Sequence, residues 1–511
     1  MYLIVNLGLK SIRMIVFNSS GSCLYSDSLP VHTSLQGDKV EQDVVEWKSL
    51  LFRLLDGLEA KTKFIPQIEN ITCTTSSSCF FGYDENMEPI TKALMVSDKR
   101  SSEEVTFIKE NLSFIEEVKG ESLSCTDSSS IPKLLWYKNN LPKIFKRIKY
   151  WLGANEFLNY EFTGEVVTDP LNASKSFYSD KSKDYLKNIF EDISVSPNLL
   201  PRVTEIGTTL NLTQKILRSY SFNKHCKYVV TTYDAICAVI GSFSGYKGDI
   251  CDVSGTVTSV RTLVKKTSKR KKHNEILLRQ NIPIIDQELI GCSNNLGGGI
   301  IEWYKQTFFH DMGNGAYAAM EDDASKSTPG ANGLIFLPYL LGERAPFIDK
   351  NIRGSFFGIN RDSKRKDFTK AVFESTAFAT NSLIELLKND GIKVEFLSLS
   401  GGLARLDLIN QIKSDVTNLP VKVIENFEST SLGAFILMRM ALGHFSSLND
   451  AVSELVTIRK IIYPNKKNIK VYSEAFSLFK EMTKLNSSIS FAHQQFSKKI
   501  GKHSSITVNN L

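Results

Sequence analysis

Several features that would assign a chain of this length to common classes are missing from the sequence. No run of about 18 apolar residues occurs, so we predict no membrane-spanning helix and no membrane partner. The 8 cysteines are scattered, without a C-x-x-C pair or zinc spacing to histidine, which argues against structural zinc and a disulfide framework. No G-x-x-x-x-G-K-[ST] segment is present, so a P-loop is excluded. We expect a reduced, cytoplasmic protein that holds any phosphate by other means.

The sequence also lacks a strong charge of one sign. Its net charge is +7 over 511 residues, with 42% apolar and 23% charged residues, as in ordinary globular proteins. The densest basic run, KKTSKRKKH at 265–273, has no aromatic or base-reading neighbours and is predicted to be a solvated loop. We therefore predict no nucleic-acid partner. The length exceeds what one hydrophobic core usually serves, which indicates two or more domains.

A pattern of two short apolar runs joined by a tight turn occurs twice. Residues 3–5 and 14–17 flank a turn at Gly8, and residues 248–264 repeat the arrangement. Helical spacing over 41–58 between strand-like runs indicates α/β layers. We therefore predict two related halves, residues 1–245 and 246–495, with a boundary in the Gly- and Ser-rich segment 241–248. The polar residues 496–511 are expected to fray.

Small-residue turns in both halves are candidates for binding phosphate. Gly8 with Ser11, and Gly255-Thr256 with Thr258, can expose successive backbone N–H groups to an anion. Each turn by itself also fits an ordinary β-hairpin. The pair indicates a phosphate site only together with further motifs.

One long segment carries a specific resemblance. Residues 333–358, GLIFLPYLLGERAPFIDKNIRGSFFG, resemble the FGGY family of carbohydrate kinases. The likeness runs from about residue 3 to about residue 445 and is nearer to the xylulokinase and gluconokinase branch than to glycerol kinase. Further matching segments are VEQDVVEW (40–47), FTGEVVTDPLNASKS (162–176), GCSNNLGGGIIEWYKQTF (291–308) and LSLSGGLARLDLINQIKSDVTNLPVKV (397–423).

The resemblance implies a fold and an activity. Two ribonuclease-H-like lobes of the actin-like ATPase type would bind ATP between them. The first lobe would bind the acceptor and supply the catalytic base, and the second would bind the nucleotide. The implied enzyme is a phosphotransferase with an alcohol acceptor, which uses ATP and Mg²⁺ to phosphorylate a sugar or polyol. The resemblance leaves a homodimer open.

The family's catalytic aspartate corresponds to Asp234 in TTYDAICAVIG. Phosphoryl transfer needs the acceptor hydroxyl held in line and its proton accepted late, for which a carboxylate of ordinary pKa is suitable. Asp234 would also contact the sugar. The alternative is that Asp234 only caps the following helix.

The nucleotide residues follow from the same resemblance. Phosphate contacts would come from the two small-residue turns and from Arg13, which alternatively is a surface arginine. Paired glycines let backbone approach a nucleotide closely. The adenosine would lie between two groups of residues, Gly298, Gly299 and Glu302 on one side and Gly401, Gly402 and Leu403 on the other.

The sugar site departs from the family's pattern. Asp98 and Arg100 match a Trp-x-Asp-x-Arg segment, but Val96 replaces its aromatic residue. Ser78 and Cys79 stand where the family usually has glutamine. The acceptor is therefore not specified, and Asp98 with Arg100 alternatively forms a simple surface ion pair.

The predicted metal site departs further from the family's pattern than the sugar site does. Asn6-Leu7-Gly8-Leu9 replaces the family's Asp-x-Gly-Thr, so a neutral amide stands where a carboxylate helps to hold Mg²⁺. Either another carboxylate compensates, with Asp252 as the candidate, or the chain has kept the fold, lost most catalysis and binds a sugar or nucleotide as a sensor. The intact Asp234 and adenosine segments favour the first interpretation.

Overall fold

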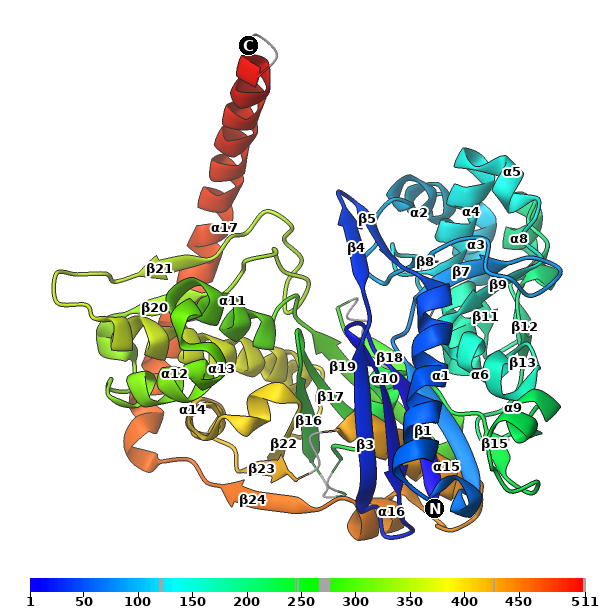
Figure 1. The fold of residues 1–511 in the computed structure, drawn as a ribbon. Helices are drawn as coiled ribbons and strands as arrows, with labels where there is room; N and C mark the ends of the chain where they lie inside the picture. The colour runs from blue at the N-terminus through cyan, green and yellow to red at the C-terminus, as the bar shows by residue number, and fades with distance from the viewer. Residues whose placement is uncertain (119–122, 244, 246–247, 266–275, 426–427, 509–511) are drawn as a thin grey trace. The chain divides into compact units, whose positions relative to one another are not determined.

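The computed structural model describes the chain apart from residues 119–122, 244, 246–247, 266–275, 426–427 and 509–511 (Figure 1). The side chains at 112, 314 and 498–508 are likewise outside the described set. The predicted basic loop and part of the predicted boundary fall in these gaps. The described chain forms two compact units. Unit 1 comprises Met1–Gly241, Ile282–Ile285 and Ser429–Leu455, and unit 2 comprises Ser242–Asn281, Asp286–Glu428 and Val456–Leu511.

Unit 1 is built on a six-stranded sheet. Its order is β14 (Thr209–Asn211), β15 (Lys227–Val229), β6 (Asn70–Thr75), β1 (Tyr2–Leu7), β2 (Ser11–Phe17) and β3 (Cys23–Pro30). All six residues of β1 are buried, as expected for a central strand with both faces covered. The predicted hairpin at residues 3–17 is thus confirmed as β1 and β2, and the third strand follows it.

Helices cover the two faces of this sheet. α1 (Val44–Lys61) begins after the capping residue Asp43, whose side chain accepts from Val45 N, and it packs its buried leucines against the sheet. α6 (Ala154–Thr163) packs on β6, and α10 (Asp234–Ile240) and α15 (Ser429–Ala441) also lie against β6. A second sheet orders β4 (Thr33–Gln36), β5 (Lys39–Gln42), β8 (Ala93–Leu94), β7 (Phe80–Tyr83) and β9 (Tyr150–Gly153). Smaller helices of unit 1 are α2 (Ser102–Lys109), α3 (Leu112–Glu117), α4 (Ser130–Asn140), α5 (Pro142–Phe145), α7 (Pro170–Ala173), α8 (Lys187–Asp192), α9 (Gln214–Ser219) and α16 (Leu448–Leu455).

Unit 2 is built on a seven-stranded sheet. Its order is β18 (Leu278–Ile282), β19 (Gln287–Ser293), β17 (Thr258–Lys265), β16 (Asp249–Ser254), β22 (Phe396–Ser400), β23 (Val421–Ile424) and β24 (Ile458–Ile462). Its helices are α11 (Gly298–Phe308), α12 (Ala316–Ser325), α13 (Arg365–Asn389), α14 (Asp407–Thr417) and α17 (Lys466–Val508). The buried α13 packs against α12, α14 and the short strand β20 (Ile335–Leu337). β20 pairs with β21 (Ser355–Phe357).

The two large sheets share one topology. In unit 1, β3, β2 and β1 are joined antiparallel, and β1, β6 and β15 are joined parallel. In unit 2, β19, β17 and β16 are antiparallel, and β16, β22 and β23 are parallel. The prediction of two related α/β halves is therefore confirmed by strand order and direction.

The compact units differ from the predicted contiguous halves. α15 and α16 follow the strands of unit 2 in sequence, yet they belong to unit 1. On α15, Phe435 lies 5.3 Å from the Tyr2 ring and 5.2 Å from the Phe17 ring, centroid to centroid. These aromatic contacts bury one face of β1 and β2, so unit 1 needs a segment from late in the chain.

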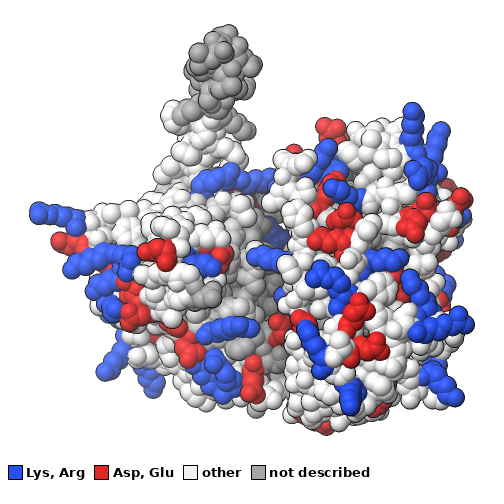
Figure 2. Space-filling view, in the orientation of Figure 1, with Lys and Arg blue, Asp and Glu red and all other residues white. Residues whose placement is uncertain are grey.

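The end of the chain also differs from expectation. The residues predicted to fray from 496 onward continue α17 as far as Val508. Among the described residues, no helix is both long and apolar enough to cross a membrane. On the face drawn in Figure 2, basic and acidic side chains are interspersed, in keeping with the small net charge.

Candidate active site

The carboxyl ends of three parallel strands meet at one edge of the unit 1 sheet. Leu7 pairs with Thr75 at the ends of β1 and β6, and Ser76 N donates to Leu7 O at 2.8 Å. The β1–β2 turn follows directly, closed by Gly8 N donating to Ser11 O at 3.0 Å. In open α/β sheets, ligands bind beyond the carboxyl ends of the strands. The predicted phosphate turn of unit 1 therefore lies where such a site is expected.

Asp234 lies beyond the same edge. The chain leaves β15 beside β6, where Thr231 Oγ1 donates to Cys73 O at 2.5 Å. Asp234 is then the first residue of α10, and it is partly exposed. Burial raises the pKa of the Cys79 thiol to about 11, with a smaller contribution from the nearby Asp234 carboxylate. The Asp234 carboxylate therefore acts electrostatically on the segment that follows β6.

The helix-cap alternative does not describe Asp234. Tyr233 occupies the N-cap position, and no side-chain hydrogen bond caps the helix there. Asp234 instead places its carboxylate in the first turn. Its charge is favoured there by the helix dipole.

Gln42, which the sequence interpretation did not single out, stabilises the turn between β1 and β2 through a hydrogen bond. Gln42 Nε2 donates to Leu9 O at 2.8 Å, and Gln42 Oε1 accepts from Trp47 Nε1 at 2.9 Å. On β2, Arg13 Nε donates to Ser11 Oγ at 3.1 Å. Ser11 and Arg13 are both partly buried, so Arg13 is not a freely solvated surface arginine.

Asn6, the predicted metal residue of unit 1, is buried near the end of β1. Its Nδ2 donates to Ser431 Oγ on α15 at 3.4 Å. This contact directs the amide nitrogen to the protein and leaves Oδ1 as the atom that could face a ligand. A neutral oxygen attracts a hard cation less than a carboxylate does.

Three glycine-containing segments predicted for the nucleotide converge in unit 2. At the start of α11, Gly298 N donates to Gly255 O at 2.8 Å and Gly299 N to Thr256 O at 3.0 Å. A Cβ added at Gly401 would lie 2.7 Å from Ser254 O. These approaches require glycine, since any side chain would separate the segments. Gly402 and Gly255 are exposed, with no atom within 4 Å of an added Cβ, so the junction presents backbone to solvent.

Three other predicted nucleotide residues are engaged within the protein. Thr258 is buried, with its hydroxyl 3.0 Å from Ser254 Oγ. Leu403 is part of the hydrophobic core. Although burial acts to raise it, the pKa of Glu302 is lowered overall, chiefly by hydrogen bonds from Lys305 and Tyr317. These residues support the segments predicted to bind the nucleotide, while Gly255, Thr256 and Gly402 are the exposed part of those segments.

Asp252 does not fit the compensating metal site that was predicted for it. Its side chain is fully buried and forms an ion pair with the buried Lys413. Its Oδ2 also accepts from Thr380 Oγ1 at 3.1 Å, and its Oδ1 accepts from Ser254 Oγ. The charge is thus already neutralised and closed off from solvent. Among the residues that the structure describes, no three His, Cys, Asp or Glu side chains gather as a metal site.

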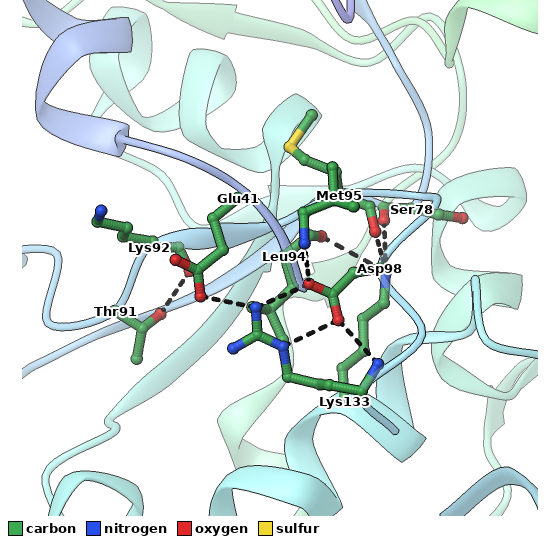
Figure 3. Close-up of polar contacts among 10 residues, drawn as sticks. Glu41, Ser78, Thr91, Lys92, Leu94, Met95, Asp98 and Lys133 are labelled. Atoms are coloured by element: carbon green, nitrogen blue, oxygen red, sulfur yellow. Dashed lines mark hydrogen bonds and ion pairs between the residues drawn. The ribbon is translucent and has the colours of Figure 1, made fainter. Parts of the chain in front are cut away.

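The predicted sugar residues Asp98 and Arg100 form a buried cluster rather than a surface pair (Figure 3). Asp98 Oδ2 accepts from Val40 N at 2.7 Å and from Arg100 Nη2 at 2.7 Å. Arg100 Nη2 also reaches Glu41 Oε1 at 2.6 Å, and the guanidinium lies over the Trp136 ring. Asp98 is fully buried, so it joins β5 to the segment after β8 and does not face solvent.

Lys133 extends this cluster and was missed by the sequence interpretation. Its Nζ donates to Met95 O at 2.7 Å, Ser78 O at 3.0 Å and Leu94 O at 3.4 Å (Figure 3). Burial lowers the pKa of Lys133 to about 8. The signal in the sequence was a lysine on the apolar face of α4, three residues after the buried Ser130.

A small polar cavity in unit 1 borders the position where the family's glutamine is replaced. Ser76 and Ser78 line it, together with Asn155 and Glu156. Glu156 accepts from Gly153 N at 2.7 Å and from the Thr168 hydroxyl. Burial raises the pKa of Glu156 to about 7, so this wall of the cavity is readily protonated.

Comparison with known proteins agrees with this arrangement. Residues 1–241 match the N-terminal domain, and residues 258–442 the C-terminal domain, of the FGGY family of carbohydrate kinases. The xylulose kinase of Staphylococcus xylosus is 25% identical over 490 residues, covering 93% of this chain and 98% of that protein. The gluconokinase of Bacillus subtilis is 26% identical over 500 residues, covering 94% and 95%.

A solved structure has the same fold. Ligand-bound xylulose kinase from Lactobacillus acidophilus matches with a TM-score of 0.83 and 22% identity, over 95% of this chain and 98% of that one. The sequence match and the repeated ribonuclease-H-like topology thus cover both units. The chain belongs to the FGGY family of carbohydrate kinases and is a phosphotransferase.

Proposed function

We propose that this kinase transfers the γ-phosphoryl group of ATP to a hydroxyl of a small open-chain sugar or aldonate, with Asp234 as the catalytic base. The observation that carries the proposal is the position of Asp234. This partly exposed carboxylate follows β15 at the sheet edge where the β1–β2 turn presents Gly8 and Ser11. Relatives named xylulose kinase and gluconokinase support the acceptor class.

The proposed step is an in-line displacement. The acceptor oxygen bonds to the γ-phosphorus as the bond from that phosphorus to the ADP oxygen breaks, and the hydroxyl proton passes to Asp234. Since the transition state is loose, positioning contributes more than early deprotonation. The turn at Gly8, with Ser11 and Arg13, binds phosphate oxygens in unit 1.

In unit 2, the exposed backbone at Gly255, Thr256 and Gly402 binds the nucleotide, and the buried residues behind it hold these segments together. The predicted protein carboxylate at Asp252 does not fit a metal role. Magnesium therefore arrives with the nucleotide's phosphates, as is usual for this ion, and supplies charge neutralisation when bound. Asn6 offers at most a neutral oxygen toward it.

Asp98, Arg100 and Lys133 act as positioning residues for the acceptor. Lys133 binds the carbonyls of Ser78 and Met95, so it links the segment after β6 to the segment after β8. Asp98 then anchors β5 to that second segment. Their substitution is expected to alter acceptor affinity through backbone placement rather than through a lost direct contact.

The test is ADP release at saturating Mg-ATP across a panel that contains xylulose, gluconate, glycerol and other pentoses and polyols. We expect acceptor-dependent ADP release with at least one of the first two compounds. The Asp234→Asn variant should lose about 10²- to 10⁴-fold in kcat while retaining ATP binding. Asp192→Asn, an exposed position in the same unit, is the matched control and should keep the wild-type rate. No transfer to any compound, or full activity of Asp234→Asn, would refute the proposal.

A further inference from the structure

α17 is a 43-residue helix, and the side chains described on it, up to residue 497, contact unit 2 mainly along one face. Tyr472, Phe476 and Phe479 pack into the core of unit 2. Further along, the same face becomes polar, with Asn486 Nδ2 donating to Arg353 O at 2.7 Å and Ser490 Oγ accepting from Arg353 N at 3.0 Å. The core-facing side of α17 is therefore filled.

A second apolar stripe runs along α17 next to that face. Its members alternate at spacings of four and three residues: Val471, Ala475, Leu478, Met482, Leu485, Ile489, Ala492 and Phe496. We call this set the α17 stripe. Ala475 and Met482 are partly covered by the unit 2 core, whereas Leu485, Ile489 and Phe496 are 67%, 60% and 60% exposed. Figure 1 shows the far part of α17 extending away from the rest of unit 2.

The periodicity of the stripe is informative. An average spacing of 3.5 residues, sustained over about four heptads, is the pattern of a helix that packs against another helix as a coiled coil. Large exposed apolar side chains in one continuous row are uncommon on a protein without a partner there. Because the core-facing side is already filled, the fold of unit 2 does not account for this row.

We infer that the α17 stripe is a homodimer interface in which α17 of two copies pack side by side, parallel and in register. A helix with the same repeat is the natural complement of the stripe, and α17 itself provides one. A twofold contact of this kind forms a closed dimer, because each copy uses the same surface and none is left to bind a third copy. The stripe spans 26 residues, or about 38 Å of helix.

The attachment of α17 to its own unit determines the orientation. Tyr472 and Phe479 bind the unit on one flank of the stripe. In a parallel twofold pair, unit 2 of one copy and unit 2 of the other lie on opposite sides of the helix pair. In an antiparallel pair that overlaps along the whole stripe, unit 2 of each copy would lie on the same side of the helix pair, and the two copies would collide.

Charge supports the same partner. Glu474 and Glu481 line the other flank of the stripe, seven residues apart and both exposed. In the parallel pair, Glu481 faces the flank of the second copy that carries the neutral Asn486, so no like charge on α17 lies opposite it.

The test is the mass of the full-length protein in solution by light scattering and sedimentation equilibrium. We expect a dimer at micromolar concentration. Leu485→Glu with Ile489→Glu places charges in the stripe and should raise the dimer dissociation constant by about a hundredfold. Ser473→Glu with Ser477→Glu adds the same charge at exposed positions outside the stripe and should leave the dimer intact.

Thermal unfolding of both double variants at a concentration where the wild type is monomeric checks that unit 2 still folds. Orientation is tested by oxidation of Leu485→Cys and Phe496→Cys in a Cys23→Ser background, because Cys23 is exposed. In a parallel pair each residue meets its own counterpart, so both variants should form disulfide-linked dimers. An antiparallel pair can link at most one of them. A monomeric wild type, an unchanged Leu485→Glu/Ile489→Glu dimer, cross-linking of only one variant, or binding of a monomer to phosphatidylcholine–phosphatidylserine vesicles would each overturn the inference.

Discussion

At the residue scale, the buried amide of Asn6 is the departure that bears on the binding of Mg²⁺. Asn6 is the last residue but one of the fully buried strand β1, and its side-chain nitrogen donates to Ser431 Oγ. The position accommodates an aspartate of nearly the same shape, whose oxygen would accept from the Ser431 hydroxyl, whereas the Asn6 amide donates to it. Only the charge would change appreciably.

We expect Asn6→Asp to lower the Mg²⁺ concentration needed for half-maximal turnover by about tenfold, because a carboxylate attracts the nucleotide-bound ion more strongly. The measurement is ADP release at fixed ATP and varied magnesium. Asn198→Asp, exposed in the turn Pro197–Leu199, makes the same charge change and should leave the magnesium curve unmoved. An inactive wild type that becomes active as Asn6→Asp would instead identify a chain that has lost catalysis and binds its ligands only.

Residues of the site differed in how well the sequence predicted them. Asp234 and the glycines at 255 and 402 were predicted from local motifs, and the structure places Asp234 in the first turn of α10 and the two glycines at exposed backbone. Asp98 matched a sugar-site segment, and Asp252 was proposed from its place before the second turn, yet both are fully buried and paired. The difference lies in neighbours that are distant in sequence, such as Lys413 for Asp252. A motif names residue types but does not state which side of the backbone faces a ligand.

At the element scale, α10 depends on α15. The two helices touch where Gly433 of α15 meets the backbone of α10, and an added Cβ would lie 1.7 Å from Cys237 O. In the other direction, a Cβ added at Gly241, which follows the last residue of α10, would lie 2.0 Å from Ser429 O on α15. Because α10 begins with Asp234, the spacing of this helix pair also sets the position of the proposed base.

Gly433→Ala should therefore destabilise the protein by about 1–3 kcal/mol and lower kcat as well, since α10 must shift to admit the methyl group. Chemical unfolding and ADP release are the two measurements. Gly315→Ala is the matched control, because no atom lies within 4 Å of its added Cβ and its φ is negative. A Gly433→Ala variant with wild-type stability would show that α10 and α15 can move apart at little cost. The close packing of the two helices would then not determine the position of Asp234.

At the scale of the whole molecule, stability should depend on four buried carboxyl groups. Burial raises the pKa of Glu156, Glu343 and Glu374 to about 7 and that of Asp169 to about 6. Their ordinary values are 4.5 for Glu and 3.8 for Asp. Between the two values of each group, the native state binds more protons than the unfolded chain. The free energy of unfolding contributed by these groups therefore falls as the pH rises from about 4 to about 7.

We expect Glu156→Gln to remove part of this decline. Its neutral amide can keep the Gly153 and Thr168 contacts, so the variant should gain stability relative to wild type as the pH rises, by at most about 3 kcal/mol. Denaturant unfolding at pH 5 and pH 7.5 measures the difference. Glu191→Gln, which is exposed, should show no such trend. Parallel pH profiles for wild type and Glu156→Gln would mean that Glu156 is ionised in both states.

Also at this scale, the sequence by itself determined the repeated α/β halves, the family and the identity of the candidate base. These rest on local periodicity and on motifs whose residues are adjacent in the chain, such as the hairpin at residues 3–17 and the segment that contains Asp234. Tertiary structure alone decided that α15 completes unit 1, that Asp252 is neutralised by Lys413 and that one face of α17 is left uncovered. Each of these depends on contacts between residues far apart in sequence, and burial and charge pairing are properties of such contacts rather than of any local pattern.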